Sequence, residues 1–254
     1  LISVFAVFKT YAPFGHSWDE ALYLYPSENV GSWVTTFLDG KDKTIFESNT
    51  INRYWGSDLD SNDPLHPEIA PVPKLLTAFG LTRLTEWFGF DPMTASRLPF
   101  AALFGATVAL IYLLGAREYG RYGGFAAAIM YLLMPRIFAH AHFAASETAI
   151  AFFIVLTVAC FLLANRWWVV ALFTGLALGL AIATKFTAFL LPVPLMIWGQ
   201  IYRRRDYASN VFAMAFFAPL VMLALWPWLW HDTLRRLFSY FLFYTEHQKT
   251  ALYY

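Results

Sequence analysis

The sequence predicts an all-α, polytopic membrane helical bundle whose early external loop carries interfacial helices. The first observation is compositional: 59% of the residues are hydrophobic and only 14% are charged, whereas a soluble domain carries about 25% charged residues. The second is a series of apolar runs, most of them close to the roughly 20 residues that a spanning helix needs. The third is one long polar region, which no bilayer core accepts, between the first and second of these runs.

The predicted spans follow one another closely after residue 97. The opening stretch "LISVFAVF" is the end of one span, and six further apolar runs occupy residues 98–115, 122–146, 148–164, 167–184, 186–202 and 207–230. The sequence therefore predicts about seven spans, the first of them incomplete. Because the chain begins within an apolar run and stops without a terminal signal, we expect it to be the N-terminal transmembrane catalytic module, over residues 1–254, of something longer.

The polar region at about residues 13–96 forms the predicted external loop. Within it, "PKLLTAFGLTRLTEWFGF" at 73–90 is apolar but contains Lys74, Arg83 and Glu86. A helix of this kind can lie in the plane of the membrane interface. A short span is the alternative for the same segment.

The short loops predict the orientation of the bundle. If 73–90 is interfacial, Arg117, Arg121, Arg166 and the arginines at 203–205 all fall on one side, which the positive-inside rule makes cytoplasmic. The opposite, external face then collects most of the remaining ionisable side chains: Asp19, Glu20, His66, His140, His142, Glu147, Lys185, His231, Glu246 and His247. Lys185 stands out because it lies in a short turn between two apolar runs, where a charge is a functional hypothesis by default. A snorkelling lysine is the alternative.

Several classes of function are disfavoured by the composition. The net charge of +1 gives no electrostatic case for nucleic acid. The single Cys160 excludes an intramolecular disulfide and a cysteine-cluster metal site. Glycine-rich phosphate loops of the nucleotide-binding type are absent from the sequence.

Other side chains have a structural interpretation. Trp226, Trp228 and Trp230 predict an interfacial aromatic belt, with stacking on a sugar as the alternative. The spacing of Gly175 and Gly179 predicts close helix packing.

The histidine pair "HAH" at 140–142 predicts a hydrogen-bonded polar turn, because its spacing does not place both rings on one helical face. Metal binding from an irregular turn is the alternative. Arg136 follows Pro135, so it either caps a kinked helix or pairs with Glu147.

Six short elements occur in a characteristic order. They are "WDEALYL" at 18–24, "HPEIAPVPKLL" at 66–76, "ASRLPFAALFG" at 95–105, "AASETAIAFF" at 144–153, "GLALGLAIATKFTAFLLP" at 175–192 and "FYTEHQK" at 243–249. With these elements the chain resembles the GT-C membrane glycosyltransferases, nearest to the dolichyl-phosphate-mannose protein mannosyltransferases and the bacterial lipid A aminoarabinose transferases. It departs from that pattern in "HPE" for "HPP", in the gap between His66 and Lys74, and in Glu147 where Asp is more usual.

The resemblance implies transfer of a hexosyl or pentosyl group from a polyprenyl-phosphate sugar to a hydroxyl of an acceptor protein, lipid or glycan. A hydroxyl is a poor nucleophile, so a general base is needed; the resemblance gives that role to Asp19, with Glu20 second or structural. The leaving phosphate needs positive charge, for which Lys185 is the first candidate. The other substrate-binding candidates are His66, Arg136, Glu147, Arg97, Glu246 and His247. The expected reaction inverts the anomeric centre and requires neither a cofactor nor a divalent metal.

Two other classes remain open at this stage. Seven spans with charged side chains fit half of a secondary transporter, although transporter sites lie near the bilayer midplane and the charges here gather at one face. A membrane scaffold or catalytically inactive paralogue is the third possibility, because of the departures at "HPE" and Glu147.

Overall fold

A computed structural model describes residues 2–10, 18–40, 42–56, 70–164, 168–202 and 207–251. Within these ranges the backbone forms helices and turns, with no strand. The prediction of an all-α polytopic bundle is therefore confirmed.

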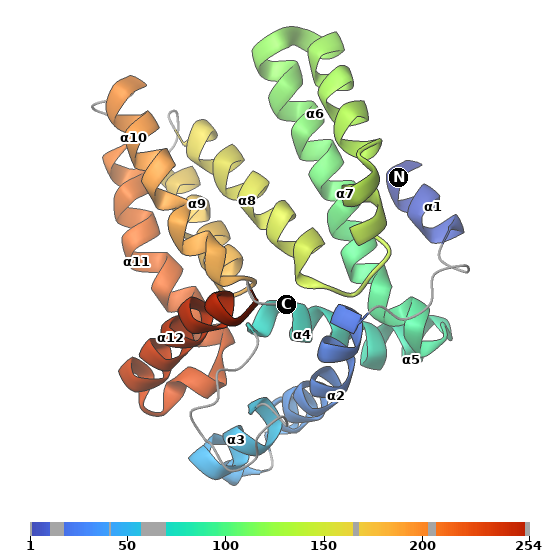
Figure 1. Ribbon diagram of the computed structural model, residues 1–254, viewed down its shortest axis with the longest axis vertical. Helices are drawn as coiled ribbons and strands as arrows, with labels where there is room; N and C mark the ends of the chain where they lie inside the picture. The colour runs from blue at the N-terminus through green and yellow to red at the C-terminus, as the bar shows by residue number, and fades with distance from the viewer. Residues whose placement is uncertain are drawn as a thin grey trace.

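In the part of the chain that the structure describes, the main bundle consists of α-helices that stand side by side (Figure 1). They are α1 (Ile2–Lys9), α6 (Pro92–Leu132), α7 (Pro135–His140), α8 (Ser146–Leu163), α9 (Trp168–Ile182), α10 (Pro192–Tyr202) and α11 (Ala208–Leu225). Three of them, α6, α8 and α11, are long and apolar enough to cross a membrane. The most extensive packing in the bundle is that of α9 against α11 and against α8.

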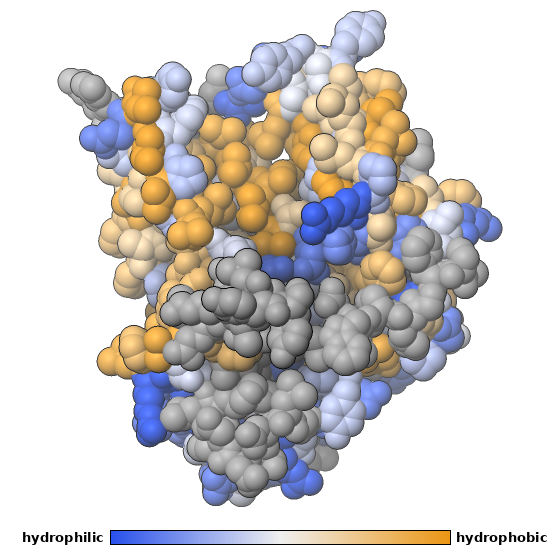
Figure 2. All heavy atoms as spheres, in the orientation of Figure 1, coloured by the Kyte–Doolittle hydropathy of each residue, from blue (hydrophilic) through white to orange (hydrophobic). Residues whose placement is uncertain are grey.

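The remaining helices form a layer at one end of this bundle, which we call the end layer (Figure 1). It consists of α2 (Trp18–Asp39), η1 (Lys43–Phe46), α3 (Ser48–Trp55), α4 (Pro71–Phe79), η2 (Gly80–Leu84), α5 (Thr85–Phe88), η4 (Pro227–Trp230) and α12 (Thr233–Ala251). Figure 2 shows hydrophobic side chains over the bundle and many hydrophilic ones over the end layer. The described parts of the predicted external loop, α2 to α3 and α4 to α5, therefore lie together at one end of the bundle.

The segment 73–90 belongs to the end layer and not to the bundle. It is helical from α4 through the π-helical turn η2 to α5, and it packs against α2 and α6. Of the two possibilities that the sequence leaves open, the packing favours an interfacial position.

α6 is a helical hairpin rather than one long helix. Gly120 has φ 74° and ψ 171°, a conformation that side chains other than glycine rarely adopt. The two arms pack so closely that a Cβ on Gly115 would lie 2.9 Å from the Cα of Gly124. The turn confirms the predicted loop between the second and third spans. Figure 1 shows the tip of the α6 hairpin at the end of the bundle opposite the end layer.

Prolines shorten three of the predicted spans. The run 122–146 is interrupted at Leu133 and Met134, and α7 restarts at Pro135. The run 186–202 is divided into a 3-10 turn, η3 (Phe186–Leu190), and α10, which starts at Pro192. The run 207–230 ends as an α-helix at Leu225, because Pro227 begins the 3-10 turn η4. In each case a proline within the apolar run lacks the N–H that would continue the helical ladder, which hydropathy alone does not register.

The predicted close packing through Gly175 and Gly179 is confirmed. A Cβ on Gly175 would lie 2.2 Å from the carbonyl oxygen of Ala213, and one on Gly179 would lie 2.6 Å from the Cβ of Val221. The two glycines thus allow the backbones of α9 and α11 to approach. A buried hydrogen bond of 2.8 Å from Thr174 Oγ1 to Asn210 Oδ1 joins the same two helices.

The predicted tryptophan belt is wrong for two of its three members. Trp226 and Trp228 are 0% and 1% exposed, and only Trp230 reaches the surface, at 37%. Trp226 packs edge-on against Tyr240 of α12, and the Arg236 guanidinium lies over Trp228. The two indoles therefore form the core between the bundle and α12, because the chain turns at Pro227 into the end layer.

Candidate functional site

A buried ion pair fixes the start of α2 against α6. Both oxygens of the Glu20 carboxylate accept from the Arg97 guanidinium, from Nε and Nη2, at 2.7 Å each. The backbone N–H of Ala144 also donates to Glu20, at 3.0 Å. Both side chains are buried, 0% exposed for Glu20 and 1% for Arg97. Glu20 therefore joins three parts of the chain: the end layer, the first arm of α6 and the turn before α8.

That turn is held by His142, which is fully buried. Its Nδ1 lies 2.8 Å from the carbonyl oxygen of Phe138, and its Nε2 lies 2.6 Å from the hydroxyl oxygen of Thr10. A neutral ring with its proton on Nδ1 satisfies both contacts. Burial lowers the pKa of His142 below its ordinary value, which favours this neutral form. The polar-turn interpretation of "HAH" is thus confirmed for His142.

A second ion pair, more exposed than the first, joins Glu147, just after this turn, to Lys185. Lys185 Nζ donates to Glu147 Oε1 at 2.7 Å, and the two side chains are 36% and 32% exposed. Glu147 is in the first turn of α8, where the helix dipole favours a carboxylate. Lys185 has an extended backbone between α9 and η3, so the turn directs its side chain across to α8.

The end layer reaches this second pair through α4. The N–H of Val72 donates to the carbonyl oxygen of Ala183 at 3.0 Å, two residues before Lys185. Lys74, two residues further along α4, is also buried, at 1% exposure. The sequence elements "WDEALYL", "VPKLL", "AASET" and "ATKF" therefore meet where the end layer joins the bundle.

The remaining predicted site residues have different positions. Arg136 is exposed at the start of α7, and among the described residues Glu147 pairs with Lys185 and not with Arg136. Figure 2 shows hydrophilic side chains gathered over α7 and the start of α8, between apolar flanks. Asp19, Glu246 and His247 have described helical backbones in α2 and α12, but their side chains lie outside the described part. His66 lies outside the described residues altogether.

One polar side chain at this junction has no role in the sequence-based prediction. The sequence marks Lys74 as a charge within the apolar segment 73–90 and by its distance from His66, and the structure buries it on α4, two residues after Val72. The signal in the sequence is a lysine inside an otherwise apolar helical start. Within the described ranges, no three His, Cys, Asp or Glu side chains are grouped so that they could hold a metal ion.

The comparison with protein families decides the class. The model of the dolichyl-phosphate-mannose-protein mannosyltransferase family matches residues 66–231, more than half of the chain. The chain belongs to this family. No curated protein and no solved structure matches it significantly.

Membership of the mannosyltransferase family makes the chain a mannosyltransferase-like glycosyltransferase of the GT-C type and an integral membrane protein. It overturns the interpretation as half of a secondary transporter. The matched range includes Arg97, Glu147 and Lys185, whereas α2 with Asp19 and Glu20 precedes it. The buried contact between Glu20 and Arg97 therefore connects α2 to the part of the chain that carries the family match.

Proposed function

We propose that this mannosyltransferase family member transfers a sugar from a polyprenyl-phosphate donor to an acceptor hydroxyl on the external side of the membrane. The observation that carries the proposal is the partly exposed Lys185–Glu147 ion pair at the junction of the end layer and the bundle. A partly exposed ammonium at the end of an apolar helix is suited to a phosphate whose lipid tail stays in the bilayer. The family match supports a glycosyltransferase in general.

In the proposed reaction the acceptor oxygen attacks the anomeric carbon as the bond from that carbon to the phosphate oxygen breaks. Asp19 accepts the proton of the acceptor hydroxyl, and the electron pair of the broken bond stays on the lipid phosphate. Because the acceptor enters opposite to the leaving group, this single displacement inverts the anomeric centre. No metal ion and no cofactor takes part in the proposed step.

Lys185 stabilises the negative charge that grows on the departing phosphate. Its ammonium has three donors, and the described contact with Glu147 uses one of them. Glu147 thus orients Lys185 while leaving donors for a phosphate oxygen. A fixed positive charge of this kind contributes most where charge develops in the transition state.

Glu20 and Arg97 act as positioning residues in this proposal. Their buried bidentate contact and the bond from Ala144 hold the first turn of α2 against the turn before α8. Asp19 is the preceding residue of the same helical turn, so its distance from the Lys185–Glu147 pair depends on this anchor. His66, Arg136, Glu246 and His247 are proposed to contact the donor or the acceptor.

The test is sugar transfer by the reconstituted protein with a panel of polyprenyl-phosphate sugars. We expect Asp19→Asn to lower kcat by about 10²–10⁴-fold with donor binding retained, because it removes the general base. Lys185→Ala should lower kcat by about 10²–10³-fold, the range for loss of one transition-state donor. Addition of a chelator should leave turnover unchanged.

The controls carry the same chemical change elsewhere in the end layer. Asp39→Asn alters the last residue of α2, and Lys43→Ala alters an exposed lysine of η1. Both should turn over like the wild type. Full activity of Asp19→Asn would remove it as the base, and a wild type that neither binds nor transfers any donor would favour an inactive paralogue.

A further inference from the structure

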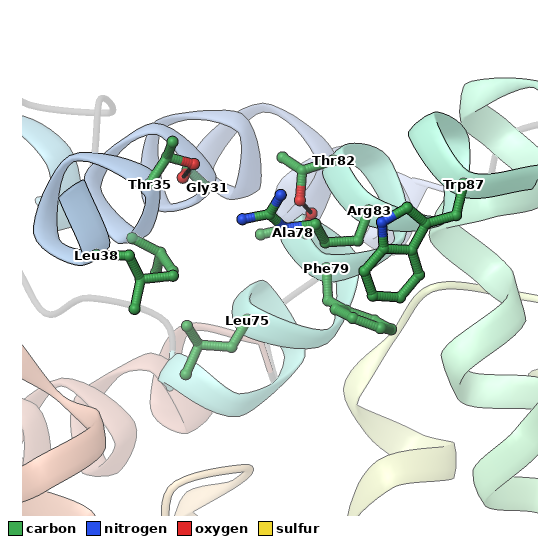
Figure 3. Close-up of a pocket in the computed structure, with 10 residues that line it drawn as sticks. Gly31, Thr35, Leu38, Leu75, Ala78, Phe79, Thr82, Arg83 and Trp87 are labelled. Atoms are coloured by element: carbon green, nitrogen blue, oxygen red, sulfur yellow. Dashed lines mark hydrogen bonds between the residues drawn. The ribbon is translucent and has the colours of Figure 1, made fainter. Parts of the chain in front are cut away.

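A groove in the end layer lies apart from the candidate site. It has a volume of about 230 Å³ and runs between α2 and the segment from α4 to α5. Its lining is mostly apolar, with one charged side chain, Arg83. Figure 3 shows the Arg83 guanidinium extending between α2 and α4, with Leu38 and Leu75 at one end of the groove and Trp87 at the other. The groove is smaller than the roughly 300–1,000 Å³ of a typical small-molecule pocket, which suits one alkyl chain better than a whole ligand.

The groove lies close to the point where the chain passes from the end layer into the bundle. α5 ends at Phe88, and the long apolar helix α6 begins at Pro92 after the N-cap Asp91. Trp87 and Phe88 are 60% and 64% exposed on the short helix beside it. Exposed aromatic rings next to the start of a membrane span are typical of the bilayer interface. Lipids of the surrounding membrane therefore have direct access to the groove.

Arg83 is the group in the lining of the groove that suits a negative charge. Thr35 and Thr82 donate their hydroxyl protons to carbonyls of their own helices, at 2.9 and 2.7 Å. Arg83 is 40% exposed, and its ion pair with Glu86, which is 64% exposed, is long at 3.5 Å. An exposed pair of this kind contributes little to stability, so the guanidinium can turn to a phosphate without a large loss.

The groove lies at a distance from Lys185, the proposed contact of the sugar donor's phosphate. Val72 of α4 donates a hydrogen bond to Ala183, two residues before Lys185. Arg83 lies eleven positions after Val72. At 1.5 Å per residue this is about 16 Å along a helix. The groove therefore lies about three helical turns along this segment from the residue of α4 that contacts the turn before Lys185.

We infer that this groove binds an anionic glycerophospholipid of the surrounding bilayer, with one acyl chain between α2 and α4 and the phosphate on Arg83. The close approach of the two elements fixes the floor of the groove, since a Cβ on Gly31 would lie 3.2 Å from Thr82 Cγ2. The lipid would hold the end layer at the membrane surface. This binding does not depend on the proposed sugar transfer.

The experiment is native mass spectrometry of the intact protein released from detergent, titrated with phosphatidylglycerol and with phosphatidylcholine of the same acyl chains. The wild type should prefer phosphatidylglycerol, and Arg83→Gln should lower that preference about fivefold, as expected for one basic side chain at an anionic surface. Thr35→Phe places a ring in the groove from an exposed position of α2 and should reduce the binding of both lipids.

The matched control is Arg235→Gln, which removes an exposed arginine from α12 of the same end layer. It should keep the wild-type preference. An equal loss of the phosphatidylglycerol preference in Arg235→Gln, or no loss in Arg83→Gln, would overturn the inference. The preference would then come from the general surface charge and not from the groove. Displacement of phosphatidylglycerol by an equimolar polyprenyl phosphate would also overturn it, because the groove would then belong to the sugar donor.

Discussion

Removal of Arg97 should destabilise the protein severely, because Glu20 would then be a buried charge without its guanidinium partner. We consider Arg97→Met, which keeps the length of the side chain but not its charge. The pair has two bonds of 2.7 Å and side-chain exposures of 1% and 0%. Breaking a buried pair from one side costs about 3–5 kcal/mol. Two bonds to charged groups, at about 1.5–3 kcal/mol each, give a similar sum.

This loss corresponds to a large change in melting temperature. For a chain of about 150–250 residues, 1 kcal/mol shifts Tm by roughly 2–4 °C, so Arg97→Met should lower Tm by about 6–20 °C. The assay is thermal unfolding in detergent at one protein concentration and one scan rate, so that the variants are directly comparable.

The double variant Glu20→Gln/Arg97→Met separates the buried charge from general damage to packing. Glutamine keeps an oxygen for the N–H of Ala144, which donates to Glu20 at 3.0 Å in the wild type, and it carries no charge. The double variant should therefore be more stable than Arg97→Met alone. A loss below about 1 kcal/mol in Arg97→Met, or a double variant no more stable than the single one, would refute the reasoning.

Two further predictions concern the bundle and its turn. Gly175→Ala should lower the free energy of unfolding by about 1–3 kcal/mol, because the new Cβ would lie 2.2 Å from the Ala213 carbonyl oxygen; thermal unfolding measures it, and an unchanged Tm would contradict the close packing of α9 and α11. His142 has a pKa lowered by burial, so the unfolded chain binds its proton more readily than the folded one. The stability that depends on His142 should be complete above about pH 6.5, the unfolded value, and should be lost as the pH falls below it. Tm measured from pH 8 to pH 5 should therefore fall more steeply in the wild type than in His142→Gln, and parallel curves would contradict the burial argument.

Hydropathy by itself determines much of the fold. Apolar runs of spanning length predict helices because a backbone in a bilayer must satisfy its own hydrogen bonds. The end layer is also visible in the sequence, since its polar stretches cannot enter the bilayer core. The prolines at which helices break, Pro135, Pro192 and Pro227, stand in the same apolar runs, but hydropathy does not show which prolines end a helix.

The pairing of charges was decided by the tertiary structure. The sequence orders Glu20, Arg97, Glu147 and Lys185 along the chain. It suggests a second catalytic or a structural role for Glu20 and a substrate role for Arg97, whereas the structure pairs these two with each other. Likewise, the sequence leaves Arg136 open as a partner of Glu147, and the structure gives Glu147 to Lys185. Hydropathy is a local property that each segment carries by itself. An ion pair between residues 77 or 38 positions apart depends on how several helices pack, so only the folded chain determines which carboxylate is an anchor and which remains open at the junction.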